Sequence, residues 1–461
     1  PPRQSGGSLG SSSRSGAMAS PSAPHQTPTR LLLLNPGSSS VKYSVLDVGG
    51  QGTTPLCEGI IEKIGESGQG KQKHKIREVG EDGLHGDKWE VRSSTDPVSS
   101  HRQALDTIFD IVSDTLAHGG AHNKSGSDLV QGIGVRVVHG GPSYSKPTRV
   151  DGRPEVLEKL REISFLAPLH NPHSIFCLEE LHEIFPSVPT FAIFDTGFFS
   201  DAPAMCSTYA LPRDLCERLY IRKFGFHGIS HQYLARRAAE HLAISSGINM
   251  VSLHLGNGCS IAAVVRGQGV QNSMGLTPLE GLVMGTRCGS VDPSIPLFLA
   301  EHARMSLQEV SNTLNKKSGL IGICGSNDMR DVLEKASYGE EEALLAAEVF
   351  AHKCREHVAG YLATVTYLAK GGEDEEHCVN CIVFSAGIGE NSAWMRWKIC
   401  QGLGPLGVVL DSAKNDACRC HDGVIAEIHD AKKSRIPVLV IHTDEDAEMG
   451  AQVVECLSQE T

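Results

Sequence analysis

The chain has 461 residues, a formal net charge of −12 and 40% hydrophobic residues, which indicates a folded protein of two or three domains. No apolar run approaches the ~20 residues that a membrane-spanning helix needs, and the acidic balance without a basic block argues against a nucleic-acid partner. The 14 cysteines are scattered along the chain behind no secretory signal. This pattern favours reduced thiols and a cytoplasmic location.

Residues 1–28 are rich in Ser, Gly and Pro and have no periodic apolar pattern, so we expect a disordered tail or an expression remnant there. Short apolar and alternating runs then predict strands, and apolar spacing of three and four predicts helices. In the first half, we expect strands at 31–35, 41–48, 133–138 and 189–195, and a helix at 173–185. The charged stretch 64–95 predicts a solvated edge hairpin or loop.

The second half repeats this alternation of strands and helices. We expect strands at 248–255, 260–267, 380–387 and 436–443, and helices at 230–243, 341–370, from about 393, and at 445–458. Each half opens with a strand, a Gly-rich turn that carries Asn, and a second strand. The sequence therefore predicts two similar α/β domains with a ligand between them.

Three Gly-rich segments could bind phosphate through exposed backbone N–H groups. The first is Asn35-Pro-Gly-Ser-Ser-Ser-Val-Lys42, the second is Gly256-Asn-Gly258, and the third is Gly387-Ile-Gly-Glu-Asn391 between a strand and a helix. Each of the first two, taken alone, is equally well explained as a structural turn. The third lacks the last Gly of the dinucleotide fingerprint and is weak evidence by itself.

Four charged or titratable residues stand in apolar surroundings. Arg136 lies inside a predicted strand and Arg287 between small residues, where a guanidinium needs an anion or a structural ion pair. His170 has a Pro on either side, and it is either a site residue or a hydrogen-bonded loop histidine. Asp195 ends a predicted strand, where carboxylates face ligands or metals, or cap helices.

Other patterns carry weaker signals. Residues 65–72 have P-loop spacing, but Gln72 replaces the required hydroxyl, so we expect a surface loop. His227 and His231 lie four apart, and without a third ligand we expect packing and hydrogen bonding rather than zinc. The Cys378–Cys381 and Cys418–His421 pairs are interpreted as surface thiols.

Taken together, these segments resemble the acetate kinase family. The matching blocks follow one order over residues 31 to about 446: N-x-G-S-S-S-x-K, R-V-V-H-G-G, A-P-L-H-N-P, F-D-T-x-F, G-x-H-G-x-S-H, H-L-G-N-G-x-S, S-M-G-L-T-P-L-E-G-L-V-M-G-T-R and G-I-G-E-N. The resemblance implies two actin-like ATPase domains of ribonuclease H type, with the active-site cleft between them. We place the first domain at 29–197 plus 447–461 and the second, nucleotide-binding domain at 198–446.

The resemblance also implies a reaction, ATP + acetate ⇌ ADP + acetyl phosphate, with Mg²⁺ or Mn²⁺, in a cytoplasmic homodimer. It implies catalytic roles for Arg136, His170, Asp195, His227 and Arg287, of which His227 and Arg287 would stabilise the transition state. Metal binding would fall to Asn35 and Glu445. The acetate site would consist of Arg136, Val138, Leu169, Phe226 and Pro278. Nucleotide binding would involve Ser38, Ser40, Lys42, His254, Asn257, Gly258, Asp328, Met329, Arg330, Gly387, Ile388 and Asn391.

The chain departs from the family pattern at Ser290 and at Asp444, which leaves the details of Mg²⁺ coordination open. Gly387-Ile388 leaves the adenosine pocket open, so we expect ATP rather than pyrophosphate. Propionate or butyrate kinase is the alternative within the enzyme class, and a non-catalytic nucleotide switch is the alternative outside it. A carboxylate is already a nucleophile at neutral pH, so we expect direct in-line transfer without a phosphoenzyme.

Overall fold

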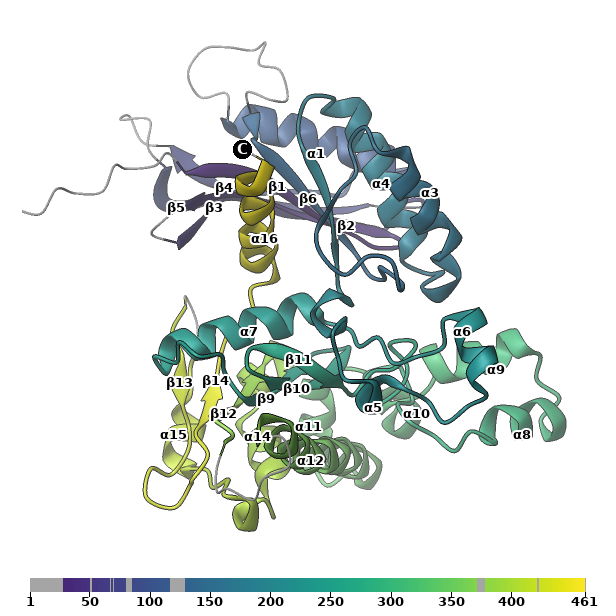
Figure 1. Cartoon of the computed structure of the whole chain (residues 1–461), viewed down its shortest axis with the longest axis vertical. Coiled ribbons are helices and arrows are strands. Elements are labelled where there is room, and N and C mark those ends of the chain that lie inside the picture. The colour runs from purple at the N-terminus through teal and green to yellow at the C-terminus, as the bar shows by residue number, and fades with distance from the viewer. Residues whose placement is uncertain are drawn as a thin grey trace, which may run out of the picture.

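The computed structural model describes residues 28–49, 52–66, 68, 70–79, 85–116, 129–370, 378–420 and 423–460. Apart from Pro28, the predicted tail lies outside these residues. Two lobes lie one above the other, with helices α7 (Gly228–His241) and α16 (Glu445–Glu460) between their sheets (Figure 1). No helix in the described ranges is long and apolar enough to cross a membrane.

The first lobe is built on an eight-stranded sheet of order β5-β4-β3-β2-β1-β6-β8-β7. Its strands are β1 (Thr29–Pro36), β2 (Ser40–Gly49), β3 (Gly52–Glu62), β4 (Lys71–Val79), β5 (His85–Ser94), β6 (Gly132–Val137), β7 (Thr148–Arg149) and β8 (Thr190–Phe194). Strands β4 and β5 are antiparallel at the sheet edge. The hairpin alternative predicted for 64–95 is therefore the correct one.

Both faces of this sheet are covered, which explains the unbroken apolar run of β1. Leu32 and Leu34 pack into the core beneath α1 (His101–Leu116), α3 (Pro154–Glu162) and α4 (Asn171–Ile184). Leu31 and Leu33 face the opposite way and pack against α16. Alternate side chains of a strand point to opposite faces, so a strand between two helix layers is apolar at every position.

The second lobe has a six-stranded sheet of order β11-β10-β9-β12-β14-β13. Its strands are β9 (Met250–Leu255), β10 (Cys259–Val265), β11 (Gln268–Asn272), β12 (Cys381–Ser385), β13 (Ala426–Glu427) and β14 (Val438–Val440). Val251 and Leu253 pack in the core beneath the long helix α12 (Glu341–Lys370), and Met250 packs on the other face against α7.

The two sheets share one topology. In each, three successive antiparallel strands are followed by two parallel strands, in the orders β3-β2-β1-β6-β8 and β11-β10-β9-β12-β14. The predicted two similar α/β halves are thus confirmed. Their Gly-rich turns, after β1 and after β9, occupy equivalent positions.

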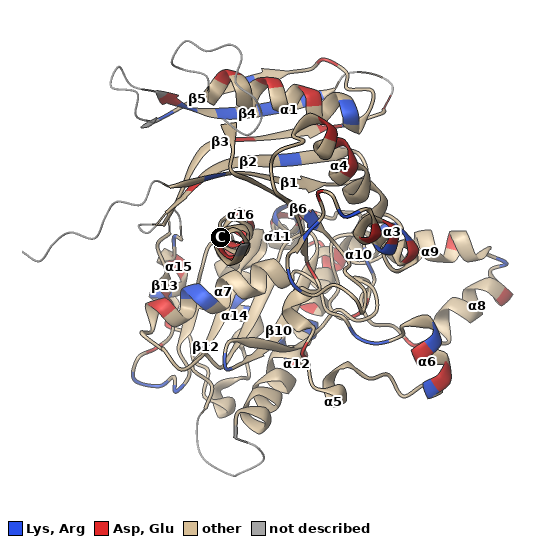
Figure 2. Cartoon of the chain, turned by 45° about the horizontal axis from the view of Figure 1, so that its top comes forward, with Lys and Arg blue, Asp and Glu red and all other residues tan. Residues whose placement is uncertain are grey.

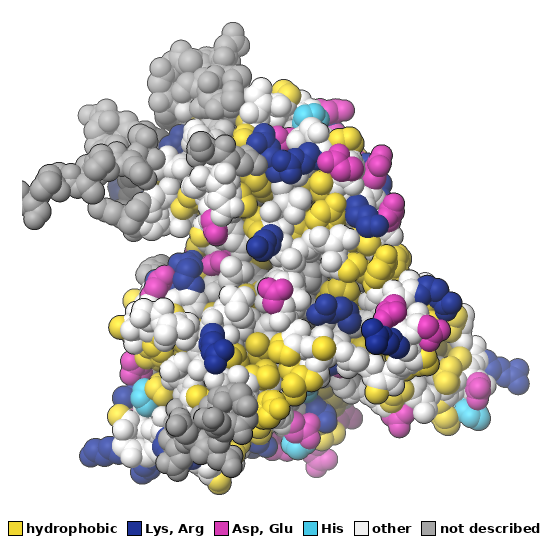
Figure 3. Space-filling view, viewed as in Figure 1, with side chains coloured by type: hydrophobic (Ala, Val, Ile, Leu, Met, Phe, Trp, Pro, Cys, Tyr) yellow, Lys and Arg dark blue, Asp and Glu magenta, His cyan; other side chains and the backbone are white. Residues whose placement is uncertain are grey.

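Shorter helices complete the second lobe and the connection to it. These are α5 (Ala204–Ser207), α6 (Arg213–Leu219), α8 (Ile295–His302), α9 (Leu307–Lys316), α10 (Leu320–Cys324), α11 (Met329–Ser337), α13 (Ala386–Asn391), α14 (Ala393–Cys400) and α15 (Ser412–Ala417). Segment 387–391, predicted as a turn, is instead helical in α13, because Ala386 takes a positive φ of 61° and turns the chain sharply after β12. Charges of both signs alternate along outer helices such as α6 (Figure 2) and over both lobes (Figure 3).

Candidate active site

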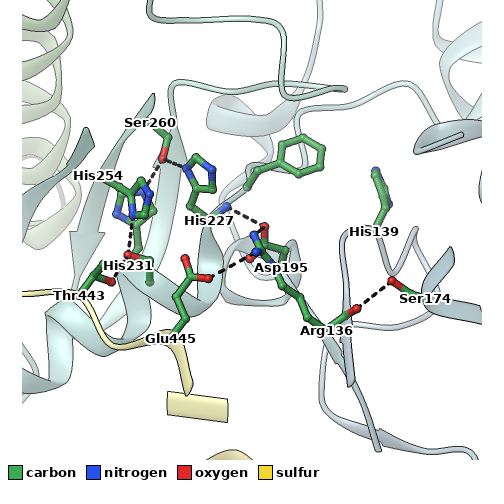
Figure 4. Close-up of polar contacts among 12 residues, drawn as sticks. Arg136, His139, Ser174, Asp195, His227, His231, His254, Ser260, Thr443 and Glu445 are labelled. Atoms are coloured by element: carbon green, nitrogen blue, oxygen red, sulfur yellow. Dashed lines mark hydrogen bonds and ion pairs between the residues drawn. The ribbon is translucent and has the colours of Figure 1, made fainter. Parts of the chain in front are cut away.

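Arg136 and Asp195 meet at the ends of the neighbouring parallel strands β6 and β8. Arg136 Nη2 donates to Asp195 Oδ2 at 2.8 Å, and Arg136 Nη1 lies 3.4 Å from Glu445 Oε2 at the start of α16 (Figure 4). The carboxyl ends of parallel strands open at one edge of the sheet, which is where α/β proteins bind ligands. The guanidinium of Arg136 therefore joins the first sheet to α16.

Asp195 is fixed by the chain on both sides of the cleft. The backbone N–H of His227 donates to its Oδ2 at 3.2 Å, and that of Gly228 donates to its carbonyl oxygen at 2.8 Å. A side chain at 228 would place Cβ 2.2 Å from that oxygen, so only glycine fits. Asp195 Oδ1 is buried and has no hydrogen-bond partner among the described residues, so one carboxylate oxygen is left available.

Glu445 also faces the first Gly-rich turn. Burial opposes ionisation of Glu445, but Arg136, His254 and Lys42 outweigh it and lower the pKa of this carboxyl. Lys42 pairs in register with Asn35 across β1 and β2, and its side chain is exposed. The turn between them, with exposed Ser38 and half-buried Ser40, thus lies on the same side of the cleft as Glu445.

Three histidines form a layer between α7 and the second sheet (Figure 4). His227 precedes α7 in a left-handed conformation, φ 54°, and its ring centroid lies 4.3 Å from that of His254. His227 Nδ1 is 3.0 Å and His231 Nε2 is 2.7 Å from Ser260 Oγ. The hydrogen bonding predicted for His227 and His231 agrees with these contacts.

Burial is the main reason that these rings stay neutral. It lowers the pKa of His227 well below its ordinary value, and the neighbouring His254, Arg136 and Arg287 lower it further. His170, which precedes α4 without a side-chain capping bond, has its pKa lowered to about 4 by burial and then by Arg287 and Arg136. Neutral imidazoles can donate or accept a hydrogen bond without adding charge.

The two arginines converge from different lobes. Each lowers the pKa of both His170 and His227, so both guanidiniums lie within electrostatic range of the same two rings. Arg287 Nη1 donates only to the carbonyl of Pro278, at 3.2 Å, and to Met284 sulfur, and no carboxylate pairs with it in the described part of the chain. A half-buried guanidinium without a carboxylate is a binding group for an external anion.

His170 is held at this place by the residue that follows it. Asn171 Oδ1 accepts from the N–H of His139, and Asn171 Nδ2 donates to the carbonyl of His139, at 3.1 and 2.8 Å. The start of α4 is thereby fixed to the chain leaving β6. This contact gives a physical reason for Asn after His in the A-P-L-H-N-P block. The Asn171 side chain binds the backbone of His139 and thereby fixes the position of His170.

A cavity of about 890 Å³ opens beside the second Gly-rich turn, a volume that suits a nucleotide. It is lined by predicted nucleotide residues Asn257, Asp328, Met329, Arg330, Gly387, Ile388 and Asn391. Gly256, from the second predicted Gly-rich segment, also lines it, as do Leu320, Asn327, Leu333 and Ser392, which were missed by the sequence analysis. His254 instead belongs to the histidine layer, and Gly258 lies next to it: a Cβ there would be 3.6 Å from the His227 ring and 3.7 Å from Arg287 Nη1.

The predicted acetate residues are not all enclosed. Phe226 is fully buried, and Val138 and Pro278 are half-buried. Leu169, however, has 56% of its surface exposed.

Glu390 is a functional candidate that the sequence analysis passed over. It pairs with His442 Nδ1 at 2.7 Å, and its Oε1 accepts from the N–H of Thr443 at 3.1 Å and from Ser385. The Glu390 carboxylate thus fixes the position of His442 and Thr443, which precede Glu445. Two features of the sequence could have indicated this pair. Glu390 is the acid of the G-I-G-E-N segment, and His442 lies two residues before the acidic run that starts at Asp444.

The interpretation of the cysteine pairs as surface thiols is wrong for three of the four cysteines, while Cys378 is partly exposed. Cys381, Cys418 and Cys420 are buried, since Cys381 begins the central strand β12 and the other two pack into the α12 core; His421 lies outside the described residues. Within the described ranges, no group of three or more His, Cys, Asp or Glu side chains could hold a metal by itself.

Two matched Gly-rich turns, a nucleotide-sized cavity and cations that converge from two lobes define a class: a two-lobed phosphoryl-transfer enzyme. The chain belongs to the acetokinase family, whose model matches residues 30–451. It is similar to the acetate kinase of Syntrophobacter fumaroxidans, at 37% identity over 93% of this chain and 97% of that protein.

Solved structures agree with this assignment. The acetate kinase of Porphyromonas gingivalis superposes with a TM-score of 0.80 at 32% identity, covering 93% of this chain and 100% of that one. A propionate kinase from Francisella tularensis superposes with a TM-score of 0.79 at 35% identity, covering 93% and 99%. The family and its fold are thus established over nearly the whole described chain.

Proposed function

We propose that this chain is an acetate kinase that transfers the γ-phosphoryl group of ATP reversibly to acetate, giving acetyl phosphate and ADP. The observation that carries the proposal is that arginines from opposite lobes flank His227. Arg136 pairs with Asp195, whose Oδ2 accepts from the His227 N–H. A Cβ at Gly258 would lie 3.6 Å from the His227 ring and 3.7 Å from Arg287 Nη1, and Arg287 has no carboxylate partner among the described residues. A phosphoryl group in flight spreads negative charge over its equatorial oxygens, and fixed cations stabilise that charge.

In this proposal each residue acts on charge or alignment. Arg136 binds the acetate carboxylate and Arg287 the migrating phosphoryl group. His170 and His227 donate hydrogen bonds to its oxygens. Because the attacking carboxylate is already ionised, no general base is needed, and transfer is direct and in-line.

The residues present fit a magnesium ion. Mg²⁺ takes oxygen ligands and is usually held by one or two carboxylates together with substrate phosphates. Asp195 has a buried oxygen without a partner in the described structure, and Glu445 lies across from it with its pKa lowered. Glu445 and Asn35 would hold the ion, with Asp195 next to it, and the ion would neutralise phosphate charge. This donor set needs no cluster of three protein side chains.

ATP is the preferred phosphoryl donor because the cavity is open where adenosine would lie. A Cβ added at Gly387 would meet nothing within 4 Å. The cavity also presents Asn257, Asp328 and Arg330 to a polar ligand. Ser38, Ser40, Lys42 and His254 would then contact the phosphates from the other side.

Propionate is the alternative acceptor, favoured by the similarity to the Francisella protein. Acetate is preferred because the β-branched Val138, packed against the core that contains Phe226, limits the length of the acyl chain. One methylene is worth ~1–3 kcal/mol, so a slower reaction with propionate is expected. We further propose a cytoplasmic homodimer.

The test is formation of acetyl phosphate, trapped with hydroxylamine, from ATP and Mg²⁺ with acetate, with propionate and with no acceptor. The proposal requires product with acetate at the highest kcat/KM. ATP hydrolysis that is equally fast without any carboxylate would instead favour a nucleotide switch, and a higher kcat/KM for propionate would favour the alternative acceptor.

A further inference from the structure

A chain of buried hydroxyl and imidazole groups runs behind His227. Ser252 Oγ lies 2.8 Å from His231 Nδ1, His231 Nε2 lies 2.7 Å from Ser260 Oγ, and Ser260 Oγ lies 3.0 Å from His227 Nδ1. Ser252, His231 and Ser260 are each fully buried. The chain thus links the sheet interior to the ring that faces the cleft (Figure 4).

The topology explains why these groups meet. Ser252 and His254 are two apart on β9, and Ser260 on β10 lies in register opposite His254. All three side chains therefore share the face of the sheet that α7 covers. His231, one turn into α7 from His227, comes down between the two serines.

Counting protons decides the direction of the chain. If His227 Nδ1–H donated to Ser260, then Ser260 would donate to His231 Nε2, and His231 Nδ1–H to Ser252 Oγ. The proton of Ser252 would then have no acceptor, since within the described structure its hydroxyl touches only His231. A buried donor without an acceptor is strongly disfavoured.

The opposite direction leaves no proton within the buried chain without an acceptor. Ser252 donates to His231 Nδ1, His231 Nε2–H donates to Ser260, and Ser260 donates to His227 Nδ1. His227 then carries its own proton on Nε2. That nitrogen lies on the cleft side, 3.6 Å from where a Cβ of Gly258 would be, and Arg287 Nη1 lies 3.7 Å from the same point.

We propose that Ser260, supported by His231 and Ser252, is a positioning residue that holds His227 in the neutral tautomer with its proton on Nε2. In that tautomer His227 is a hydrogen-bond donor to a phosphoryl oxygen, and in the other tautomer it presents a lone pair that repels the same oxygen. The inference rests on the proposed role of His227 as a donor to the phosphoryl group. No contact of Ser260 with a substrate is required.

The direct test is the tautomer itself, read from two-bond ¹⁵N–¹H spectra of the ligand-free protein with ¹⁵N-labelled histidine, at pH 7.5. The His227 signals are assigned by their loss in His227→Gln. We expect Nε2–H in the native protein and a mixture or Nδ1–H in Ser260→Ala. Nδ1–H in the native protein would overturn the proposal, even if Ser260→Ala fails to fold.

Kinetics then separate positioning from stability. Ser260→Ala should lower kcat at least roughly tenfold, with KM for ATP and acetate within about threefold, and Ser260→Thr, which keeps the hydroxyl, should restore the tautomer and most of kcat. Ser273→Ala is the matched control, because Ser273 is equally buried and accepts from Ile261 N–H next to Ser260 but lies outside the chain. It should leave the tautomer unchanged.

Two results would contradict the proposal: an unchanged kcat and tautomer in Ser260→Ala, or the same tautomer change in Ser273→Ala. If the predicted tautomer is found but His227→Gln retains full kcat, the role of His227 fails while the positioning chain stands.

Discussion

Arg136 is ion-paired to Asp195, with 2.8 Å between Nη2 and Oδ2 across neighbouring strands. This pair fixes one guanidinium of the proposed site before any substrate binds. Arg287, on the opposite lobe, has only a carbonyl and a thioether as partners in the described structure. The two arginines are therefore expected to differ in what their removal does.

Arg287→Ala should lower kcat/KM by about 10³-fold, or about 4 kcal/mol of transition-state stabilisation, with little change in unfolding free energy because no carboxylate is left unpaired. Steady-state kinetics and urea unfolding measure the two effects. Arg136→Ala is the comparison: it leaves Asp195 buried without its partner and should lower stability as well. Equal stability losses in both variants would contradict this assignment.

Val138→Ala should raise the ratio of kcat/KM for propionate over acetate about tenfold, because removing two methyl groups makes room for one methylene. Val137→Ala is a matched control, since Val137 is the next residue and is buried in the core of the first lobe. It should cost stability without altering the ratio. An unchanged ratio in Val138→Ala would remove Val138 from the acyl pocket.

Gly387→Gln should raise KM for ATP about tenfold or more while KM for acetate stays nearly constant, because the new side chain enters the cavity rather than the protein interior. Gly360→Gln is the control: Gly360 is exposed in α12 with equally open space around a Cβ. The same KM for ATP in both variants would place adenosine elsewhere.

The buried His139 should make the stability of the protein depend on pH. Burial lowers its pKa to about 4, and its Nδ1 accepts from Gly141 N–H at 2.8 Å. Between pH 6.5 and 4 the unfolded chain thus binds a proton at His139 that the folded chain does not bind. The free energy of unfolding therefore falls as the pH drops from 6.5 toward 4, and His139 accounts for at most about 3 kcal/mol of that loss.

His139→Asn keeps an acceptor for Gly141 but cannot titrate. Its unfolding free energy, measured in urea from pH 7.5 to 5, should fall less steeply than that of the native protein. The difference between the two slopes against pH should correspond to the uptake of at most one proton on unfolding. The comparison isolates His139 from the other buried histidines. Parallel curves would show that His139 is protonated equally in both states.

Much of the architecture follows from periodicity. All eight strands and all five helices expected from the sequence are present, because buried strands such as β1 and amphipathic helices such as α16 leave a local signal. Segment 387–391 was predicted as a turn, since two glycines outweigh helix propensity in sequence, whereas in the fold the sharp bend at Ala386 starts a helix directly.

The site was less predictable because its contacts join distant segments. A charge inside an apolar strand indicated Arg136 and a strand end indicated Asp195. Nothing local shows that Ser252 and Ser260 face α7 and bond to His231. The register of β9 on β10 decides that. The cysteine pairs failed for the same reason, since burial of Cys418 and Cys420 depends on the packing of α12 and not on their spacing.

The central claim is that guanidinium groups from both lobes meet at one transfer site, with Arg136 at the acetate carboxylate and Arg287 at the migrating phosphoryl group. The most direct measurement is a crystal structure with ADP, Mg²⁺, acetate and planar aluminium fluoride, which mimics that group. We predict Arg136 and Arg287 both within hydrogen-bond distance, about 3 Å, of the acetate oxygens or the fluorides. A complex in which Arg287 lies in a separate part of the cleft, away from the fluoride, would contradict the account.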